Sequence, residues 1–157
     1  MIARVASWVK GAWRGPWGPV LRTLVAGVLS AIVFVVAHPP MWRGDGHGVG
    51  LFPGGALTGV HWADLAFARA SVADGVLPLW NPWDRGGYAF FAEPHSGMFD
   101  PVTWAVVGLG VVIGGAPAWL AVLKVVLHFG IAGAGFAAFF RERRLPPWAV
   151  AFGTLAL

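Results

Sequence analysis

The feature that most constrains this chain is a pair of long apolar runs. The first extends over residues 20–37 and contains one charged residue, Arg22. As a helix, these 18 residues would be about 27 Å long, close to the ~30 Å hydrocarbon thickness of a bilayer. The second run covers residues 118–140, and its 23 residues are enough to cross a bilayer. We therefore predict two transmembrane helices, at residues 20–38 and 118–140.

The composition excludes a free-standing water-soluble enzyme. Of the 157 residues, 57% are hydrophobic and 11% are charged, whereas a soluble domain has about 25% charged residues. The chain has no cysteine, which excludes disulfides, thiolate metal sites and cysteine nucleophiles. We expect an all-α integral membrane protein.

The charges are segregated along the chain in a way that indicates membrane topology rather than nucleic-acid binding, although the net charge is +4. Residues 1–19 contain three basic residues and no acid, whereas six of the seven acids lie between Pro39 and Pro101. A second basic group occupies residues 141–144. Because basic residues favour the cytoplasmic side, we predict a cytoplasmic N-terminus (1–19), an external loop (39–101) and a cytoplasmic turn (141–147).

A cleaved signal peptide is the alternative interpretation of the first run, since it has a basic start and an apolar centre. The run is long for a signal peptide, and no small-x-small cleavage motif precedes Pro39 and Pro40. We favour a retained anchor.

The external loop is too polar to cross the membrane, and we expect one short juxtamembrane helix in it, at about residues 61–75. Trp62, Leu65, Val72 and Val76 would share its apolar side, and Asp64 would lie on the other. Gly75 is a suitable C-terminal stop.

Two further apolar segments complete the expected organisation. Residues 102–116 are short for a span and contain four glycines, so we expect a juxtamembrane or re-entrant helix. Residues 148–157 have the composition of another transmembrane helix that is cut short. We therefore interpret the chain as the N-terminal fragment of a larger polytopic protein.

Asp64 is the acid best placed for chemistry, because a surface helix would hold it at the height of a lipid headgroup. A carboxylate there could act as a general base toward an acceptor hydroxyl; a solvated helix face is the alternative. Histidines 47, 61 and 95 with Asp45, Asp64 and Glu93 are potential metal ligands. The sequence indicates no definite cofactor and leaves a divalent cation open.

Residues 74–87, DGVLPLWNPWDRGG, form the most distinctive segment. Its two prolines favour extended backbone before them, and Gly86 and Gly87 permit a tight reversal. The segment would hold Trp80 and Trp83 in a rigid turn. Their rings could stack on a sugar or pack within the protein.

This segment resembles part of a known family. The run G-x-L-P-L-W-N-P at residues 75–82, a glycine-rich turn, an acid, a glycine and F-x-P at residues 99–101 are similar to the bacterial YfhO-like membrane proteins of the GT-C glycosyltransferase superfamily. The resemblance covers roughly residues 60–157 and is specific from 74 to 104. The chain departs from the family pattern at Phe67 and Ala68, where a polar residue is common, and at His95, where glutamine is common.

The resemblance implies a multi-pass inverting glycosyltransferase in the bacterial inner membrane, which transfers a sugar from a polyprenyl-phosphate donor to a glycan or lipid acceptor of the cell envelope. Asp64 and Glu93 match the family's loop acids, and Asp64 would be the base of a single displacement. The expected substrate-binding residues are Arg69 and Arg85, for the phosphate, with Trp80, Asn81, Trp83 and His95.

Two other functions remain open. A non-catalytic membrane scaffold or assembly subunit would use the external loop to bind a partner. A transporter fragment would place functional charges inside the spans, and Lys124 and His128 are the candidates.

Overall fold

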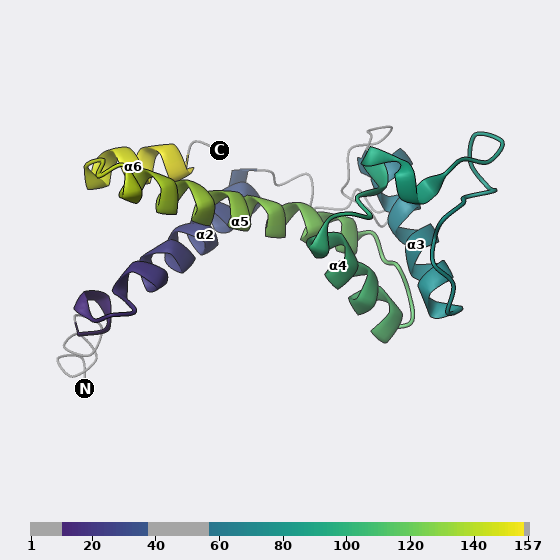
Figure 1. The fold of residues 1–157 in the computed structure, drawn as a ribbon, viewed down its shortest axis with the longest axis horizontal. Coiled ribbons are helices and arrows are strands. Elements are labelled where there is room, and N and C mark those ends of the chain that lie inside the picture. Colours follow the sequence, from purple (N-terminus) through teal and green to yellow (C-terminus); the bar gives the residue numbers. More distant parts are fainter. Residues whose placement is uncertain (1–10, 38–56, 156–157) are drawn as a thin grey trace. The chain divides into compact units, whose positions relative to one another are not determined.

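The computed structural model describes residues 11–37 and 57–155. Across these two ranges the chain is mainly helical and contains no strand, only an isolated antiparallel bridge between Asn81 and Tyr88. The all-helical prediction is therefore confirmed (Figure 1). Arg4 and Lys10, in residues 1–10, and Asp45 and His47, in residues 38–56, lie outside the described residues.

The chain forms two compact units. The first combines residues up to Ala37 with residues from Val126 onward, and the second contains His38–Val125. Both units share the long helix α5 (Trp119–Glu142).

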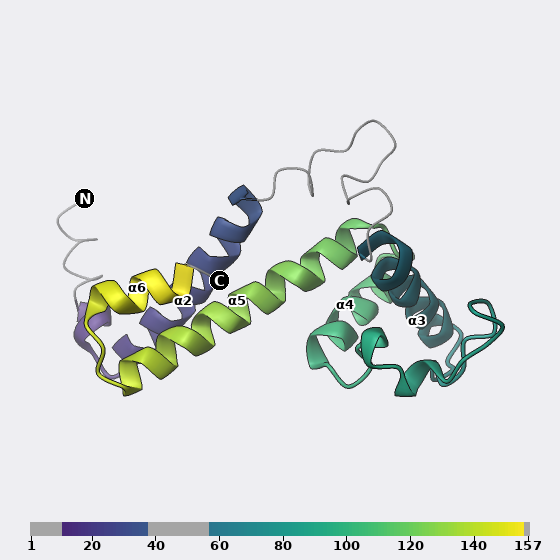
Figure 2. The same ribbon diagram turned by 90° about the horizontal axis from the view of Figure 1, so that it is seen from above.

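The first unit is built from α2 (Gly18–Ala37), the later part of α5, and α6 (Pro147–Leu155). Helices α2 and α5 run antiparallel, because the start of α2 contacts the end of α5 (Figure 2). Arg141 Nη1 donates hydrogen bonds of 2.8 Å to the Pro19 carbonyl and to Thr23 Oγ1. At the other end, the rings of Phe34 and Phe129 stack with their centroids 4.1 Å apart.

Small residues let α2 and α5 approach closely. A Cβ atom at Gly27 would lie 2.6 Å from the Gly130 carbonyl oxygen, and one at Gly133 would overlap the side chain of Ser30. Contacts between small residues of this kind are typical of helix pairs in membranes, where van der Waals packing replaces the hydrophobic effect.

Both predicted spans are present as helices. With 20 and 24 residues, α2 and α5 are long and apolar enough to cross a membrane, judged by length and composition. Their bounds differ from the predicted 20–38 and 118–140 by no more than two residues. Many apolar side chains of α2 are exposed, among them Leu24, Val28 and Val36. Exposed apolar side chains of this kind are typical of helices that contact lipid or a protein partner.

The second unit contains a π-helical turn η2 (Leu57–Trp62), α3 (Ala63–Ala73), two 3₁₀ turns, η3 (Phe90–Ala92) and η4 (Pro94–Ser96), and α4 (Pro101–Val112). Its core contains buried side chains from α3, η3, α4 and the start of α5, together with Met98, which precedes α4. They are Leu65, Ala68, Phe90, Met98, Val106, Val107, Leu120 and Ala121.

Helix α3 ends as predicted, but its buried side matches the predicted one only in part: Leu65 is buried and Val72 packs against the core. Gly75 adopts a positive φ of 74° and stops the helix. However, Asp64 is buried together with Leu65 and Ala68, whereas Trp62 and Val76 are exposed. The expectation that Asp64 lies on a solvated face is therefore wrong. The reason is tertiary: α4 packs against α3, and residues 64, 65 and 68 form a continuous stripe on one side of a helix.

Helix α4 begins at a well-formed cap. Asp100 accepts hydrogen bonds from the backbone N–H groups of Val102 and Thr103, at 3.1 and 3.0 Å, and Pro101 occupies the first turn. The 12 residues of α4 rise about 18 Å, which is shorter than the ~30 Å of a bilayer core. Helix α4 ends before the predicted residue 116, because Gly114 follows with a φ of 75°.

Candidate functional site

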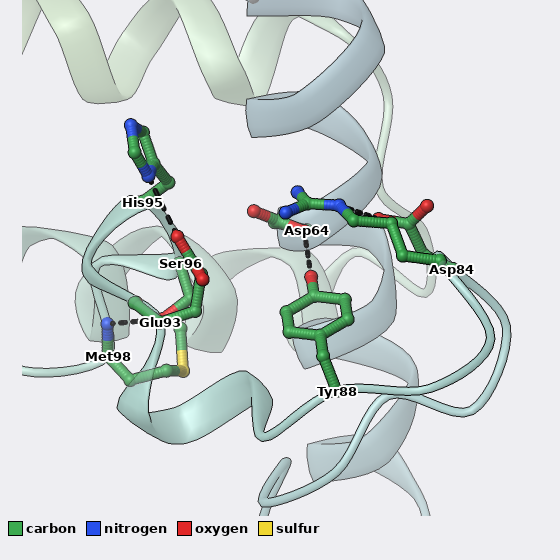
Figure 3. Close-up of polar contacts among 8 residues, drawn as sticks. Asp64, Asp84, Tyr88, Glu93, His95, Ser96 and Met98 are labelled. Carbon is green, nitrogen blue, oxygen red and sulfur yellow. Dashed lines mark hydrogen bonds and ion pairs between the residues drawn. The ribbon is translucent and has the colours of Figure 1, made fainter.

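A buried carboxylate lies at the centre of the second unit. Asp64, in the first turn of α3, is 4% exposed. Tyr88 Oη donates a hydrogen bond of 2.9 Å to Asp64 Oδ1 (Figure 3). Asp64 Oδ2 is buried and has no hydrogen-bond partner among the described residues. A buried acceptor without a partner costs about 1–3 kcal/mol, and this oxygen is shielded from solvent in the structure.

The environment of Asp64 changes its acidity. Burial raises the pKa of the Asp64 carboxyl above its ordinary value of 3.8, while the Tyr88 hydrogen bond and the charges of His61 and Arg85 act in the opposite direction. Burial also raises the pKa of Tyr88, and its hydrogen bond to the carboxylate adds to the effect. Asp64 is therefore a stronger base than an exposed aspartate, and Tyr88 remains a donor at neutral pH.

A tight reversal of the chain places Tyr88 beside α3. Asn81 and Tyr88 exchange two backbone hydrogen bonds, of 2.9 and 3.0 Å. Between them, Arg85, Gly86 and Gly87 have positive φ values of 53°, 75° and 97°. The predicted turn at the glycine pair is thus confirmed. The positive φ at Arg85 is unfavourable for a residue with a side chain.

Arg85 brings a positive charge to the same place. Its guanidinium carbon lies 5.0 Å from the centre of the Tyr88 ring, and its Nε donates a 3.1 Å hydrogen bond to Asp84 Oδ2. Its charge lowers the pKa of both Asp64 and Glu93, as a minor contribution in each case. Arg85 is exposed, so its remaining N–H groups are accessible to an anion.

Glu93 and His95 form a second polar pair. His95 Nδ1 lies 2.8 Å from Glu93 Oε1 (Figure 3), and this hydrogen bond lowers the pKa of Glu93. The centres of the His61 and His95 rings are 6.4 Å apart, which connects this pair to the start of α3. Ser96 Oγ donates a 2.7 Å hydrogen bond to the Glu93 carbonyl and so fixes the turn.

Four of the eight predicted site residues therefore belong to one region of the second unit: Asp64, Arg85, Glu93 and His95. Two of the others support the turn. Asn81 is buried, and its Oδ1 accepts a 3.0 Å hydrogen bond from the Trp83 backbone N–H. Trp80 lies against Gly87, where a Cβ would come within 2.8 Å of its ring.

The last two predicted residues are placed differently. The Trp83 side chain is 87% exposed and is accessible to a ligand. Arg69 Nε donates a 3.2 Å hydrogen bond to the Gly110 carbonyl, so this guanidinium connects α3 to α4. A contact between Arg69 and a substrate phosphate stays a prediction.

The divalent cation also stays a prediction. In the described ranges, no three histidine, aspartate or glutamate side chains come close enough to hold a metal ion.

The sequence reasoning missed Tyr88, the residue in direct contact with Asp64. Tyr88 is the chain's single tyrosine and directly follows the glycine pair, and these are the signals that could have identified it. Lys124 is a second polar residue of this unit. A Cβ at Gly97 would lie 2.8 Å from Lys124 Nζ and 2.9 Å from Thr103 Oγ1, so Lys124 reaches the start of α4.

Comparisons with protein-family models, with curated proteins and with solved structures find no match to this chain. The family resemblance at residues 74–104 therefore stays a prediction.

Proposed function

We propose that this chain acts in a membrane glycosyltransferase reaction, in which Asp64 is the general base. The enzyme would transfer a sugar from a polyprenyl-phosphate donor to a cell-envelope acceptor. The observation that carries the proposal is the buried Asp64 carboxylate, held by Tyr88 through one oxygen and unpartnered at the other among the described residues. The motif resemblance supplies the reaction class.

The membrane setting of the proposal is supported by the first unit. The basic residues near the start of α2 and those at the end of α5 lie at the same end of an antiparallel pair. If both helices cross the bilayer, the positive-inside tendency places this end in the cytoplasm. The protein would then be a multi-pass component of the bacterial inner membrane, with residues 38–118 on the external side.

Once the substrate can reach it, Asp64 Oδ2, which is buried in this structure, would accept the proton of the acceptor hydroxyl. As this proton is transferred, the hydroxyl oxygen bonds to the anomeric carbon of the donor, and the bond from that carbon to the phosphate oxygen breaks. The phosphate departs with the electron pair, and the sugar configuration inverts. The raised pKa of Asp64 suits this role, because a base is most effective when its pKa approaches the working pH.

The neighbouring residues supply the other requirements of the reaction. Arg85 is an exposed cation beside the Asp64–Tyr88 pair, and a guanidinium stabilises a departing phosphate through charge-assisted hydrogen bonds. The exposed ring of Trp83 is suited to stacking on a sugar. Glu93 and His95 would bind substrate hydroxyls from the other side of the Asp64 region.

One observation favours the alternative, a non-catalytic scaffold or assembly subunit. Residues 76–83 expose several large apolar side chains in succession, namely Val76, Leu77, Leu79, Trp80 and Trp83. Exposed apolar surface of this kind is typical of a protein interface. In a scaffold, this surface would bind the partner and Asp64 would have no catalytic role.

Asp64→Asn distinguishes the two functions. In the full-length protein we expect sugar transfer to fall at least about 100-fold, the lower end of the contribution of a general base, with normal abundance in the membrane. The measurement is transfer of a radiolabelled sugar from a polyprenyl-phosphate donor in membrane vesicles.

Asp74→Asn is the matched control. Asp74 is an exposed aspartate at the other end of α3, so this variant should retain transfer. Full transfer by an abundant Asp64→Asn variant would reject the catalytic role and favour the scaffold.

A further inference from the structure

The first unit contains a pocket that the proposed sugar transfer does not use. Helices α2, α5 and α6 lie side by side there (Figure 2) and enclose about 520 Å³. Its apolar lining includes Val25 and Leu29 from α2, Ala137 from α5 and Val150 from α6.

Two arginines line this pocket, and no acid does. Arg22 Nη2 donates a 2.9 Å hydrogen bond to the Trp13 carbonyl, and Arg141 uses Nη1 for its two contacts with the start of α2. Neither arginine forms an ion pair with any residue in the described part of the chain. Each guanidinium has five N–H donors, so both retain donors for an anion.

The arginines occupy the same end of the pocket. Arg22 lies one turn inside the start of α2, and Arg141 lies next to the last residue of α5. Because the two helices are antiparallel, these positions come together, while Leu29 lies about two turns further along α2. The pocket is therefore positively charged toward the helix ends and apolar along its length.

We propose that this pocket binds an anionic phospholipid of the cytoplasmic leaflet. The phosphate would bind Arg22 and Arg141 at the depth of the headgroups, and an acyl chain would lie along Val25, Leu29 and Ala137. Basic pockets between transmembrane helices on the cytoplasmic side bind anionic headgroups in this way. The proposal requires the first unit to lie in the membrane, but it is independent of sugar transfer.

The apolar lining favours a lipid over free phosphate. Two arginines alone would bind inorganic phosphate, but a small anion would leave the apolar part of the pocket unfilled. A single phospholipid molecule would satisfy both parts of the pocket. Its charged phosphate would bind the arginines at the helix ends, and its acyl chain would fill the apolar space beyond them.

The test is binding of phosphatidylglycerol to the full-length protein in a mild detergent, measured by native mass spectrometry, with zwitterionic phosphatidylcholine as the reference lipid. We expect preferential binding of phosphatidylglycerol. Arg22→Gln should weaken this binding about tenfold or more, because it removes a charge-assisted contact. Arg22 makes one hydrogen bond to the backbone, so this variant disturbs the fold less than a change at Arg141.

Two further variants make the test specific. Arg143→Gln makes the same change in charge on an exposed residue outside the pocket lining and should leave binding unchanged. Ala151→Trp places a large ring at an exposed position of the lining and should reduce binding without any change in charge. Circular dichroism of each variant checks that the helices are retained.

Three outcomes would overturn the proposal. Equal binding of the two lipids would show that the arginines do not select an anion. Equal losses for Arg22→Gln and Arg143→Gln would indicate general surface attraction. Competition by inorganic phosphate at the concentration of the lipid, with no effect of Ala151→Trp, would show an anion site without an acyl chain. None of these outcomes depends on the Asp64 activity assay.

Discussion

At the scale of single residues, Asp64 and Tyr88 form a hydrogen-bonded pair in which the pKa of both groups is raised. A carboxyl group with a raised pKa contributes to folded stability below its unfolded pKa, about 3.8, and that contribution is lost as the pH rises through the folded value. The hydrogen bond from Tyr88 opposes the effect of burial. The hydrogen bond therefore reduces the loss in free energy of unfolding that the buried, ionised Asp64 causes at neutral pH.

Tyr88→Phe tests this balance. The variant keeps the ring beneath Arg85 but removes the hydroxyl, so we expect the free energy of unfolding at pH 7 to fall by about 1–2 kcal/mol. The pKa of Asp64 should rise further, because a hydrogen bond to its charged form is lost. The acidic limb of the pH–rate profile of sugar transfer should then move to higher pH.

The pH dependence of the stability change provides the control. As the pH falls toward 3.8, more of the Asp64 carboxyl is protonated in both proteins, and the difference in melting temperature between wild type and Tyr88→Phe should be smaller than at pH 7. A difference that does not change with pH, together with an unshifted rate profile, would mean that Tyr88 only fills space.

At the scale of elements, capping defines where α4 begins. The Asp100 side chain accepts two backbone hydrogen bonds, and Oδ2 also accepts a 2.7 Å hydrogen bond from Thr103 Oγ1. Helix α4 packs against α3, and α3 carries Asp64. The cap of one helix therefore supports the position of the candidate base on another.

Asp100→Ala should lower the free energy of unfolding by about 0.5–2 kcal/mol, the usual range for loss of an N-cap. Hydrogen exchange should become faster at the Val102 and Thr103 amides, which lose their acceptor. Asp100→Asn should restore most of the stability, since asparagine is also a good N-cap. Exchange rates in Asp100→Ala equal to those of Asp74→Ala would contradict a capping role.

At the scale of the whole molecule, the antiparallel α2–α5 pair predicts a topology that can be measured. The chain has no cysteine, so a single introduced cysteine reports the side of the membrane on which its segment lies. Asp84→Cys and Arg143→Cys both replace exposed residues, one in the second unit and one just after α5.

With one crossing between these positions, a membrane-impermeant maleimide should label Asp84→Cys in intact cells and Arg143→Cys only after permeabilisation. Labelling of both in intact cells, or of neither, would reject the single-crossing topology. The asymmetry would be expected because α4 is too short to add a second crossing.

Local sequence determined the helical elements and much of their extent. Apolar runs as long as a bilayer is thick predicted α2 and α5, and Gly75 and the Gly86–Gly87 pair predicted a helix end and a reversal. These features follow from short-range physics, namely the hydropathy of consecutive residues and the backbone freedom of glycine.

Tertiary packing decided the environment of Asp64. A weakly amphipathic helix has no strong preference for which side it buries, so its partner makes the choice, and α4 covers the side that carries the acid. Tertiary packing also brings Tyr88 into contact with Asp64, which is 24 residues away in the sequence. It places Arg22 and Arg141 in the lining of one pocket in the same way. Such contacts depend on how separate elements pack together, so they cannot be predicted from the residue spacing within one segment.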